Sequence, residues 1–572
     1  MKTVSLLLLS MVLLPAILHA APPDAGTLLN EQRQQGNRLP DRLPAPDKSV
    51  TDRPPQSDSG AKVTVKAFRF TGLGAIATEA ELQELVKNDV GRQLGFAELQ
   101  VVADRITVYL REKKGYLLPR AYFPKQDITE GVIEIAIIAG RVDGKVKINR
   151  AQSARISQSL LEGIAGNAVP EGSMIRMEEI ERAALLMNDI PGVEAKSSLE
   201  PGSTPGTARI IIDADEGPLL NGSITSDNYG DRYTGTWRGT GQISANDPFN
   251  IGDQLSLSLT GAENLIQGRF SYSLPLGTSG LAGSLTYTGL YYELGGNLTS
   301  LKANGRADTI AASLSYPLMR SRSASIWGGL GFEYQIMTDE ANGITTKDHS
   351  IPVGNASLTG SFQDSFGGGG LTSLNITLYS GNIDLSAVAD AQTTDDAGPK
   401  TSGTFWRSSY SLSRLQSLTR QLTLSASARG QFTTGNLDSS QKFILGGSTG
   451  VRAYPTGEAS GDEGHAFTVE TRYDIPGIPA WVATQLIGFI DTGWVKLHHD
   501  TWPGSIANIS GRNDYWLSGG GIGLNIGKAG LYSIRGIWAR TIDSNRGRSS
   551  ADRDADNRSE NDRFWLQAMV WF

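Results

Sequence analysis

Alternating apolar and polar residues dominate the chain from about Leu219 to its end. The last segment is the clearest case, because every second residue back from the terminus is apolar: Phe572, Val570, Ala568, Leu566 and Phe564. A period of two is typical of a β-strand with one face in an apolar medium. The same alternation recurs in residues 254–260, 281–287 and 421–427. The pattern predicts an antiparallel sheet, and the alternative for the last segment is the edge strand of a soluble sheet.

The connections between these strands differ in length. Short turns with Pro follow Tyr272, Ser315 and Tyr473, whereas residues 338–349, 390–403 and 541–562 form long polar connections. Short turns at one end and long loops at the other are typical of a transmembrane barrel. At about ten residues per strand and a similar average connection, residues 218–572 predict a membrane β-barrel of about 16 antiparallel strands.

The N-terminal residues 1–20 have the pattern of a secretory signal peptide. Lys2 precedes a short apolar stretch that Pro15 interrupts, and Ala20 offers a small residue at the cleavage site. A membrane anchor is the alternative, but the apolar run is short for a span of about 20 residues. We therefore expect an exported bacterial protein.

Two segments separate this signal from the globular part. Asp24 is placed to cap a helix in residues 21–38, and the polar character of that helix predicts a wet or channel-like environment. Residues 39–60 are rich in Pro, Asp and Ser, which predicts an extended, semi-rigid linker.

Residues 61–139 and 140–217 repeat one pattern of elements. Each unit reads strand, helix, helix, strand, strand, and the second helix of the first unit carries the apolar stripe Leu99, Val102, Ile106 and Leu110. Two such units of about 75 residues indicate an internal duplication. They resemble POTRA domains, which bind extended peptides by adding them to a sheet edge. The alternative is a pair of unrelated α+β domains.

Composition restricts the function further. Sixty-seven Gly residues, 39% apolar residues and a mean hydropathy of −0.22 suit a sheet in which only alternate residues face lipid. Without Cys the chain has no disulfide and no thiolate nucleophile. A net charge of −7 argues against nucleic acid as a partner.

Two short motifs distinguish between kinds of barrel. Residues 446–454 read Gly-Gly-Ser-Thr-Gly-Val-Arg-Ala-Tyr, and residues 488–494 read Gly-Phe-Ile-Asp-Thr-Gly-Trp. Together with the paired units, the linker and the N-terminal helix, they resemble the outer-membrane transporters of two-partner secretion, the haemolysin and filamentous-adhesin secretion-activation family. The resemblance covers essentially the whole mature chain.

The resemblance implies a loop that folds back into the barrel lumen. Its Val451, Arg452, Ala453 and Tyr454 correspond to a Val-Arg-Gly-Tyr motif, and the barrel wall supplies Phe489, Asp491 and Gly493. A guanidinium can hold a carboxylate with two parallel hydrogen bonds, so Arg452 and Asp491 are the expected pair. Ala453 replaces the usual Gly and would be strained if its φ were positive. The alternative is that Arg452 is exposed and Asp491 is an ordinary lumen charge.

The terminal strand carries a second implied signal. An aromatic last residue, Phe572, with Phe564 on the same face, resembles the signal by which barrel-assembly machinery recognises outer-membrane proteins. The resemblance also implies a monomer in outer-membrane lipid.

Other candidate sites are weaker. His498, His499 and Asp500 suggest a metal, but adjacent side chains point apart and no further ligand motif follows. The Gly-rich stretch 519–529 lacks the spacing and the Ser/Thr of a phosphate loop. No nucleophile elbow with a credible partner set occurs, so we predict no enzyme, no metal and no cofactor.

The resemblance implies a translocation pore of a Gram-negative outer membrane. Its periplasmic POTRA domains would recognise an unfolded exoprotein of the haemolysin or adhesin type, which is then secreted without ATP. Activation of that exoprotein, as well as its export, stays open, as does plugging of the pore by the N-terminal helix. The alternative functions are an outer-membrane insertase, which usually carries more POTRA units, and a passive porin, which gives the paired domains no role.

Overall fold

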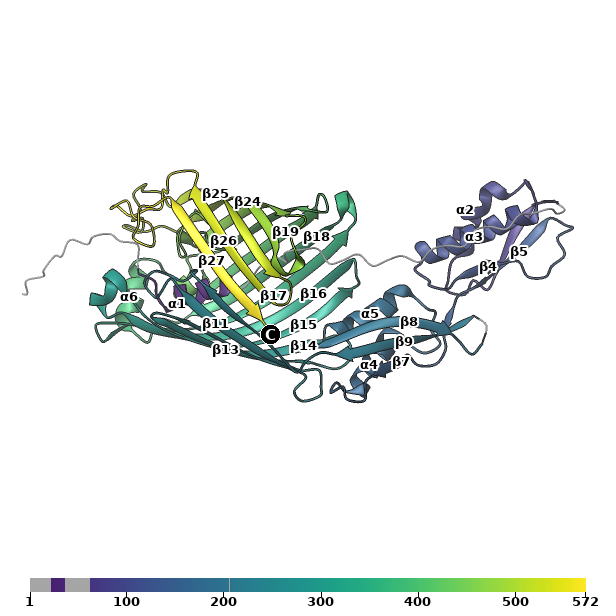
Figure 1. Ribbon diagram of the computed structural model, residues 1–572, viewed down its shortest axis with the longest axis horizontal. Coiled ribbons are helices and arrows are strands. Elements are labelled where there is room, and N and C mark those ends of the chain that lie inside the picture. The colour runs from purple at the N-terminus through teal and green to yellow at the C-terminus, as the bar shows by residue number, and fades with distance from the viewer. Residues whose placement is uncertain (1–21, 36–61, 205) are drawn as a thin grey trace, which may run out of the picture.

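A computed structural model describes residues 22–35, 62–204 and 206–572. The predicted signal peptide, residues 1–20, and the linker, residues 39–60, lie outside these ranges. The molecule is elongated: a barrel forms one part, and two small α+β domains extend in line from one of its ends (Figure 1). We call the barrel rim next to these domains proximal and the opposite rim distal. Within the described ranges, no helix has the length and apolar character needed to cross a membrane.

The first α+β domain packs two helices on a small sheet. Its long helix α3 buries the predicted stripe Leu99, Val102, Ile106 and Leu110, together with Ala103. Thr78 and Glu81 form a capping box that starts α2. The elements are β1 (Val63–Thr64), β2 (Ala67–Thr71), α2 (Glu79–Val86), β3 (Gln93–Leu94), α3 (Phe96–Glu112), β4 (Arg120–Tyr122) and β5 (Val132–Ile138), with strands in the order β2-β5-β4.

The second α+β domain repeats this order with one difference from prediction. Its predicted first strand is divided into β6 and β7, because Gly144, with φ of 76°, turns the chain between them. Both halves pair with β9, and β8 pairs with its other side. The elements are β6 (Arg141–Val142), β7 (Lys147–Arg150), α4 (Gln158–Ala168), α5 (Met177–Asn188), β8 (Val193–Pro201) and β9 (Thr207–Glu216).

Main-chain hydrogen bonds join the two α+β domains. The amides of Leu117 and Gly140 donate to Ile175 and Leu118 at 3.0 and 3.1 Å, and the Ile175 amide donates back to Gly140 at 2.9 Å. Gly140 leaves no room for a side chain, since a Cβ there would lie 2.7 Å from that of Leu118. The backbone itself therefore fixes this joint.

The second domain also docks on the proximal turns of the barrel. Arg320 of the barrel donates to both carboxylate oxygens of Asp189 at 2.7 and 3.0 Å. Arg182 donates to the Pro317 carbonyl at 3.2 Å. Helix α5 therefore lies directly against the rim.

Sixteen strands close into an antiparallel barrel, which confirms the predicted architecture. Apolar side chains alternate outward; on the last strand, Phe564, Leu566 and Val570 are exposed while Trp565 is buried inside. The strands are β10 (Leu220–Asp227), β11 (Arg238–Asn246), β12 (Gln254–Ala262), β13 (Leu265–Pro275), β14 (Ala282–Glu293), β15 (Asn304–Arg320), β16 (Ala324–Ala341), β17 (Ile344–Asp364), β18 (Gly370–Ile383), β19 (Gly403–Ser417), β20 (Leu422–Thr433), β23 (Glu463–Asp474), β24 (Ala483–Lys496), β25 (Asp514–Lys528), β26 (Tyr532–Thr541) and β27 (Asp562–Trp571).

Two predicted long connections are more ordered than expected. The prediction of a long polar connection over 338–349 is wrong. β16 and β17 continue almost to the tip of a hairpin, where Asn342 and Gly343 adopt φ of 51° and 76°. An Asn-Gly pair with both φ positive is a favoured hairpin turn, and the polar flanks concealed it. The connection 390–403 contains helix α6 (Ala389–Ala397) at the distal rim (Figure 1).

Helix α1 (Ala25–Gln34) lies inside the barrel (Figure 1). Asp24 caps it by accepting a hydrogen bond from the Thr27 amide at 2.8 Å. The predicted wet or channel-like environment agrees with this place in the lumen, but one face of the helix packs in an apolar cluster. Ala25, Leu28 and Leu29 are buried against apolar side chains of the inner wall, including Leu290, Tyr292 and Met337. Two adjacent leucines in an otherwise polar helix were the signal for this contact.

Candidate functional site: a loop held in the barrel lumen

The connection between β20 and β23, residues 434–462, folds into the barrel, and we call it the lumen loop. Its short strands β21 (Phe443–Ile444) and β22 (Ser460–Gly461) pair with each other. At its tip, Val451, Ala453 and Tyr454 are at most 2% exposed and pack in an apolar cluster with the inner wall. The loop therefore has a core of its own within the lumen.

Arg452 and Asp491 are in direct contact. The Arg452 Nε and Nη2 donate to the two carboxylate oxygens of Asp491 at 2.8 and 2.9 Å, and the Arg452 amide adds a third bond at 3.1 Å. Thr468 donates to the same carboxylate at 2.9 Å. Asp491 is fully buried and Arg452 is 5% exposed. A bidentate pair of this kind fixes the position of both partners.

Glu470 is a further partner of Arg452 that the sequence analysis missed. It accepts a hydrogen bond from Arg452 Nη1 at 2.5 Å and another from Arg472 Nε at 2.8 Å. The Arg452 guanidinium also lies over the Phe489 ring, 3.4 Å from its centroid. Glu470 occupies an inward position of β23, where polar side chains are ordinary in a barrel, so no local pattern marked it as a partner.

Ala453 fits its position without the suspected strain. Its φ is not among the positive values of the described residues, although Ala459 in the same loop has φ of 56°. The wall provides the space, because a Cβ on Gly519 would lie 2.4 Å from the Ala453 Cβ. The methyl group therefore sits where the facing residue has no side chain.

Glycines flatten the wall beneath the rest of the loop. A Cβ on Gly493 would lie 2.3 Å from Leu445 of the loop, and one on Gly521 would lie 2.6 Å from the Phe489 ring. The Tyr454 hydroxyl donates to the Ser518 carbonyl at 3.3 Å. Gly493 and Tyr454 thus hold the loop by shape and by one polar contact.

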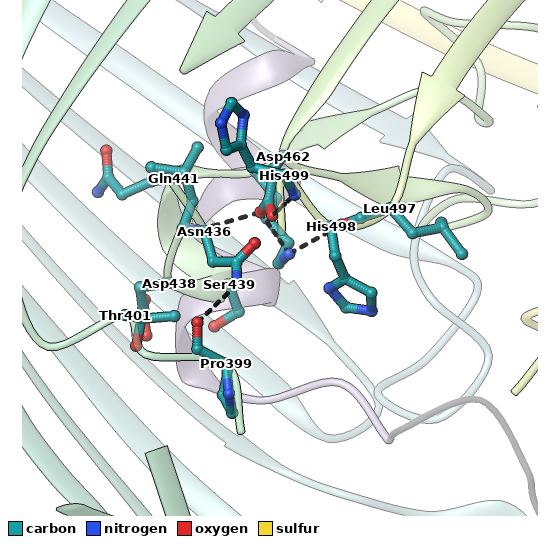
Figure 2. A network of polar contacts seen from close by, with 12 residues as sticks. Pro399, Thr401, Asn436, Asp438, Ser439, Gln441, Asp462, Leu497, His498 and His499 are labelled. Atoms are coloured by element: carbon teal, nitrogen blue, oxygen red, sulfur yellow. Dashed lines mark hydrogen bonds and ion pairs between the residues drawn. The ribbon is translucent and has the colours of Figure 1, made fainter. Parts of the chain in front are cut away.

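The base of the lumen loop is tied to the distal connections (Figure 2). Lys442 donates to Asp462 at 2.5 Å and to the Leu497 carbonyl at 3.2 Å. Asp462 also accepts the amides of Leu437 and His499 at 3.1 and 2.8 Å. The buried Asp462 therefore joins both ends of the loop to the β24–β25 connection.

The histidine pair is part of this distal structure. The His499 Nδ1 lies 2.8 Å from Glu463, whereas His498 lies 3.2 Å from the Ser505 carbonyl. The two side chains have separate partners. Among the described residues, no group of three His, Cys, Asp or Glu side chains is arranged to hold a metal ion.

Helix α1 lies beside the lumen loop and contacts it mainly through uncharged groups. Ser439 donates to Asp24 at 2.7 Å, and Asn30 donates to the Lys442 carbonyl at 2.6 Å. The wall contributes Asp339, which accepts the Ala25 amide at 2.9 Å. Two partly exposed ion pairs join the helix to the wall: Arg33 lies 3.1 Å from Glu333, and the N-cap Asp24 lies 3.9 Å from Lys347. Beside the helix remains a cavity of about 640 Å³ with polar walls, lined in part by Gln32, Arg33, Arg238 and Glu333.

Acidic groups gather around α1. Burial is the main reason why the pKa of Glu31 lies well above its usual range, and the nearby Asp231 raises it further. Burial likewise raises the pKa of Asp231 to about 7 and that of Glu458, in the lumen loop, to about 7. Oε1 of Glu31 has no hydrogen-bond partner among the described residues. Ionised carboxylates are therefore poorly accommodated around the docked helix.

The terminal aromatic residues lie on the outer wall. Phe564 and Phe572 are 68% and 66% exposed, on the face that carries the other outward apolar side chains. The main chain of Phe572 exchanges two hydrogen bonds with Gly222, at 2.9 and 3.0 Å. The last residue therefore contributes to closing the barrel between β10 and β27.

Comparison with known proteins identifies two families. Residues 206–526 match the family described as haemolysin secretion/activation protein ShlB/FhaC/HecB, and residues 63–140 match the POTRA domain, ShlB-type. The heme/hemopexin transporter protein HuxB of Haemophilus influenzae strain 86-028NP is 28% identical over 99% of this chain and 97% of its own length. The outer membrane transporter CdiB of Escherichia coli is 24% identical over 83% of this chain and 79% of its own length.

A solved structure has the same fold. CdiB from Escherichia coli covers 96% of this chain and 100% of its own length with a TM-score of 0.75, at 20% sequence identity. The barrel, the paired domains and their order are therefore an architecture already known from experiment.

Proposed function

Because the chain belongs to the haemolysin secretion/activation family and is an outer-membrane transporter of two-partner secretion, we propose a division of labour among its parts. The POTRA domains lie in the periplasm, so the proximal rim is the entrance and the distal rim the exit. The POTRA pair captures an unfolded exoprotein, the lumen loop keeps the barrel competent for transport, and α1 closes the pore between transport events.

The buried contact between Arg452 and Asp491 carries this proposal. A charge pair that is withdrawn from water in a lumen is stable only with matched geometry and further hydrogen bonds, and here Glu470 and Thr468 supply them. The rest of the barrel closes through its own strand pairing. We infer that the pair serves the position of the loop rather than the fold of the wall.

Capture by the POTRA pair rests on its place at the entrance. The second domain docks on the proximal turns through Asp189 and Arg320, which puts its sheet beside the pore mouth. Deleting residues 61–216 tests this role: we expect a barrel that inserts normally but exports no cargo. Undiminished cargo outside such cells would refute capture by these domains.

The cargo is proposed as a large exoprotein secreted in an unfolded state, with folding outside the cell in place of ATP as the source of direction. A reading frame for a large secreted repeat protein next to this gene, secreted only when the transporter is present, would support this proposal. Export of an unrelated, already folded protein would contradict it.

The terminal strand is proposed as the signal for barrel-assembly machinery, and the assembled transporter as a monomer. Phe572→Ala tests the signal, with Phe366→Ala in an exposed turn as control. We expect less heat-modifiable barrel in the outer membrane for the first variant only. Equal amounts for both would show that Phe572 is dispensable.

A further inference from the structure

The seam between the first and last barrel strands is short. β10 and β27 share five register pairs, from Ser223 with Trp571 to Asp227 with Gln567, whereas β26 pairs with β27 over nine. The distal half of β27, residues 562–566, therefore extends beyond the last β10 pair. β26 pairs with this stretch on one side, so only its β10 side needs a contact other than the strand register.

One side chain continues the pairing on the β10 side. Asn228 Nδ2 donates to the Phe564 carbonyl at 2.8 Å, and its Oδ1 accepts the Leu566 amide at 2.8 Å. The Asn228 amide also donates to the Leu566 carbonyl at 3.2 Å. A single residue thus satisfies three main-chain groups along this edge.

On the inner side, the lumen loop holds the same stretch. Trp565 is 6% exposed, points into the lumen, and donates from Nε1 to the Arg452 carbonyl at 2.7 Å. Its ring meets Tyr229 edge-on, with centroids 5.7 Å apart. The Tyr229 carbonyl in turn accepts a bond from Thr456 of the loop at 3.0 Å.

Arg452 consequently contacts the wall on two sides. Its guanidinium and amide bind Asp491 on β24, and its carbonyl binds Trp565 on β27. These strands are separated by β25 and β26 in the barrel order. A shift of the loop tip must therefore change both contacts together.

We propose that Trp565 is a positioning residue that couples the lumen loop to the distal seam, the contact of residues 562–566 with the end of β10 and Asn228. It holds the Arg452 backbone so that the guanidinium meets Asp491, and with Asn228 it keeps the distal end of β27 against β10. Withdrawal of the loop removes the bonds from Trp565 and Thr456, so the distal seam loosens when the loop leaves. This inference rests on the proposed role of the lumen loop and adds a partner for it.

Amide hydrogen exchange of the purified full-length protein in lipid nanodiscs tests the coupling without any cargo. Trp565→Phe keeps a ring but loses the indole N–H, which removes one buried hydrogen bond. We expect exchange to rise about three- to tenfold in residues 446–458 of the loop as well as in 562–566. Arg452→Ala should raise exchange in 562–566, although its own side chain does not touch that strand.

Trp538→Phe is the matched control. Trp538 lies on the neighbouring strand opposite Phe564, on the same outer face, so its replacement should leave both regions at native exchange. Thr456→Val, which removes the bond to Tyr229, gives a second approach if Trp565→Phe assembles poorly. Faster exchange confined to β27 in Trp565→Phe, with the loop unchanged, would overturn the coupling, as would an unchanged seam in both Arg452→Ala and Thr456→Val.

Export assays separate this inference from the proposed function. Normal export by Arg452→Ala would refute the role of the loop, whatever the exchange pattern. Native exchange in Trp565→Phe would refute the coupling even where Arg452→Ala blocks export.

Discussion

The lumen loop and helix α1 both fill the barrel, but they are held by different means. The loop tip is fixed by a fully buried charge network on Asp491 and by an apolar cluster. Helix α1 relies on Leu28 and Leu29, on single hydrogen bonds and on two partly exposed ion pairs. It also brings Glu31 into a site that raises the pKa of its carboxyl.

This difference favours helix α1 as the element that leaves the lumen in the proposed transport cycle. Removing one partner from a buried charge pair is costly because the other remains uncompensated, so the loop is stable only as a matched unit. Departure of the helix would break ion pairs of Arg33 and Asp24 that are already partly exposed, and ionisation of Glu31 would favour it.

The largest expected effect is the loss of the loop's charge pair. Arg452→Ala should reduce export about tenfold or more, since a broken buried pair costs about 3–5 kcal/mol and 1.4 kcal/mol corresponds to a factor of ten. Barrel abundance should stay near normal. Cargo in the medium and heat-modifiable barrel in the membrane are the two measurements.

The double variant with Asp491→Ala sharpens this result. If the two residues act as one unit, it should be no worse than either single change. Strictly additive defects would mean that they act separately, and the loop would lose its status as the fixed element. Arg472→Ala, which removes a neighbouring contact of Glu470 but leaves the main pair, serves as control.

Deletion of residues 24–35 should have the next largest effect. Conductance in planar bilayers should rise several-fold because the helix no longer occupies the lumen, while export persists. The quadruple change of Asn30, Gln32, Gln34 and Gln35 to Ala keeps the helix and provides the comparison. Unchanged conductance after the deletion would show that the lumen loop alone closes the pore.

Raising the pH should release the helix. The docked state favours protonated Glu31, because burial and the nearby Asp231 and Asp556 raise its pKa, although Arg238 acts in the opposite direction. Docking is therefore strongest below the ordinary pKa of Glu and weakens as the pH rises through the raised value. Channel openings should therefore become more frequent as the pH rises above the ordinary pKa of a Glu carboxyl.

Glu31→Gln provides the check on this prediction. It should keep the helix docked and flatten the pH dependence, since the amide carries no charge. An identical pH profile in the variant and the native protein would assign the dependence to other groups, with Asp231→Asn as the next variant.

The smallest effect is expected at the helix cap. Asp24→Ala removes an N-cap, which costs about 1 kcal/mol, so openings should become about fivefold more frequent. Asp24→Asn retains capping ability and should lie close to the native protein. Equal behaviour of Ala and Asn would show that the contacts of Asp24 Oδ2 with Ser439 and Lys347, rather than capping, are what matter at Asp24.

The sequence predicted the barrel well because period-two alternation directly reflects which residues face lipid. It placed Arg452 and Asp491 only through resemblance, since they are 39 residues apart and no local pattern joins them. The sequence did not single out Trp565, because it lies at an inward position and leaves the outward apolar alternation of Phe564 and Leu566 intact. Glu470 escaped because a single inward carboxylate is common in a lumen. Long-range contacts of this kind depend on how the strands close, which local sequence does not encode.

The backbone joint at Gly140 has a consequence for the exoprotein. Main-chain bonds fix the first POTRA domain to the second, and the ion pair of Asp189 with Arg320 fixes the second to the rim. The first domain is therefore held at a fixed distance from the pore. A cargo held by the first domain must span a set distance before its next segment reaches the pore. The spacing between recognition segment and leading segment in the cargo should therefore be selected by length, independently of the residues that fill it.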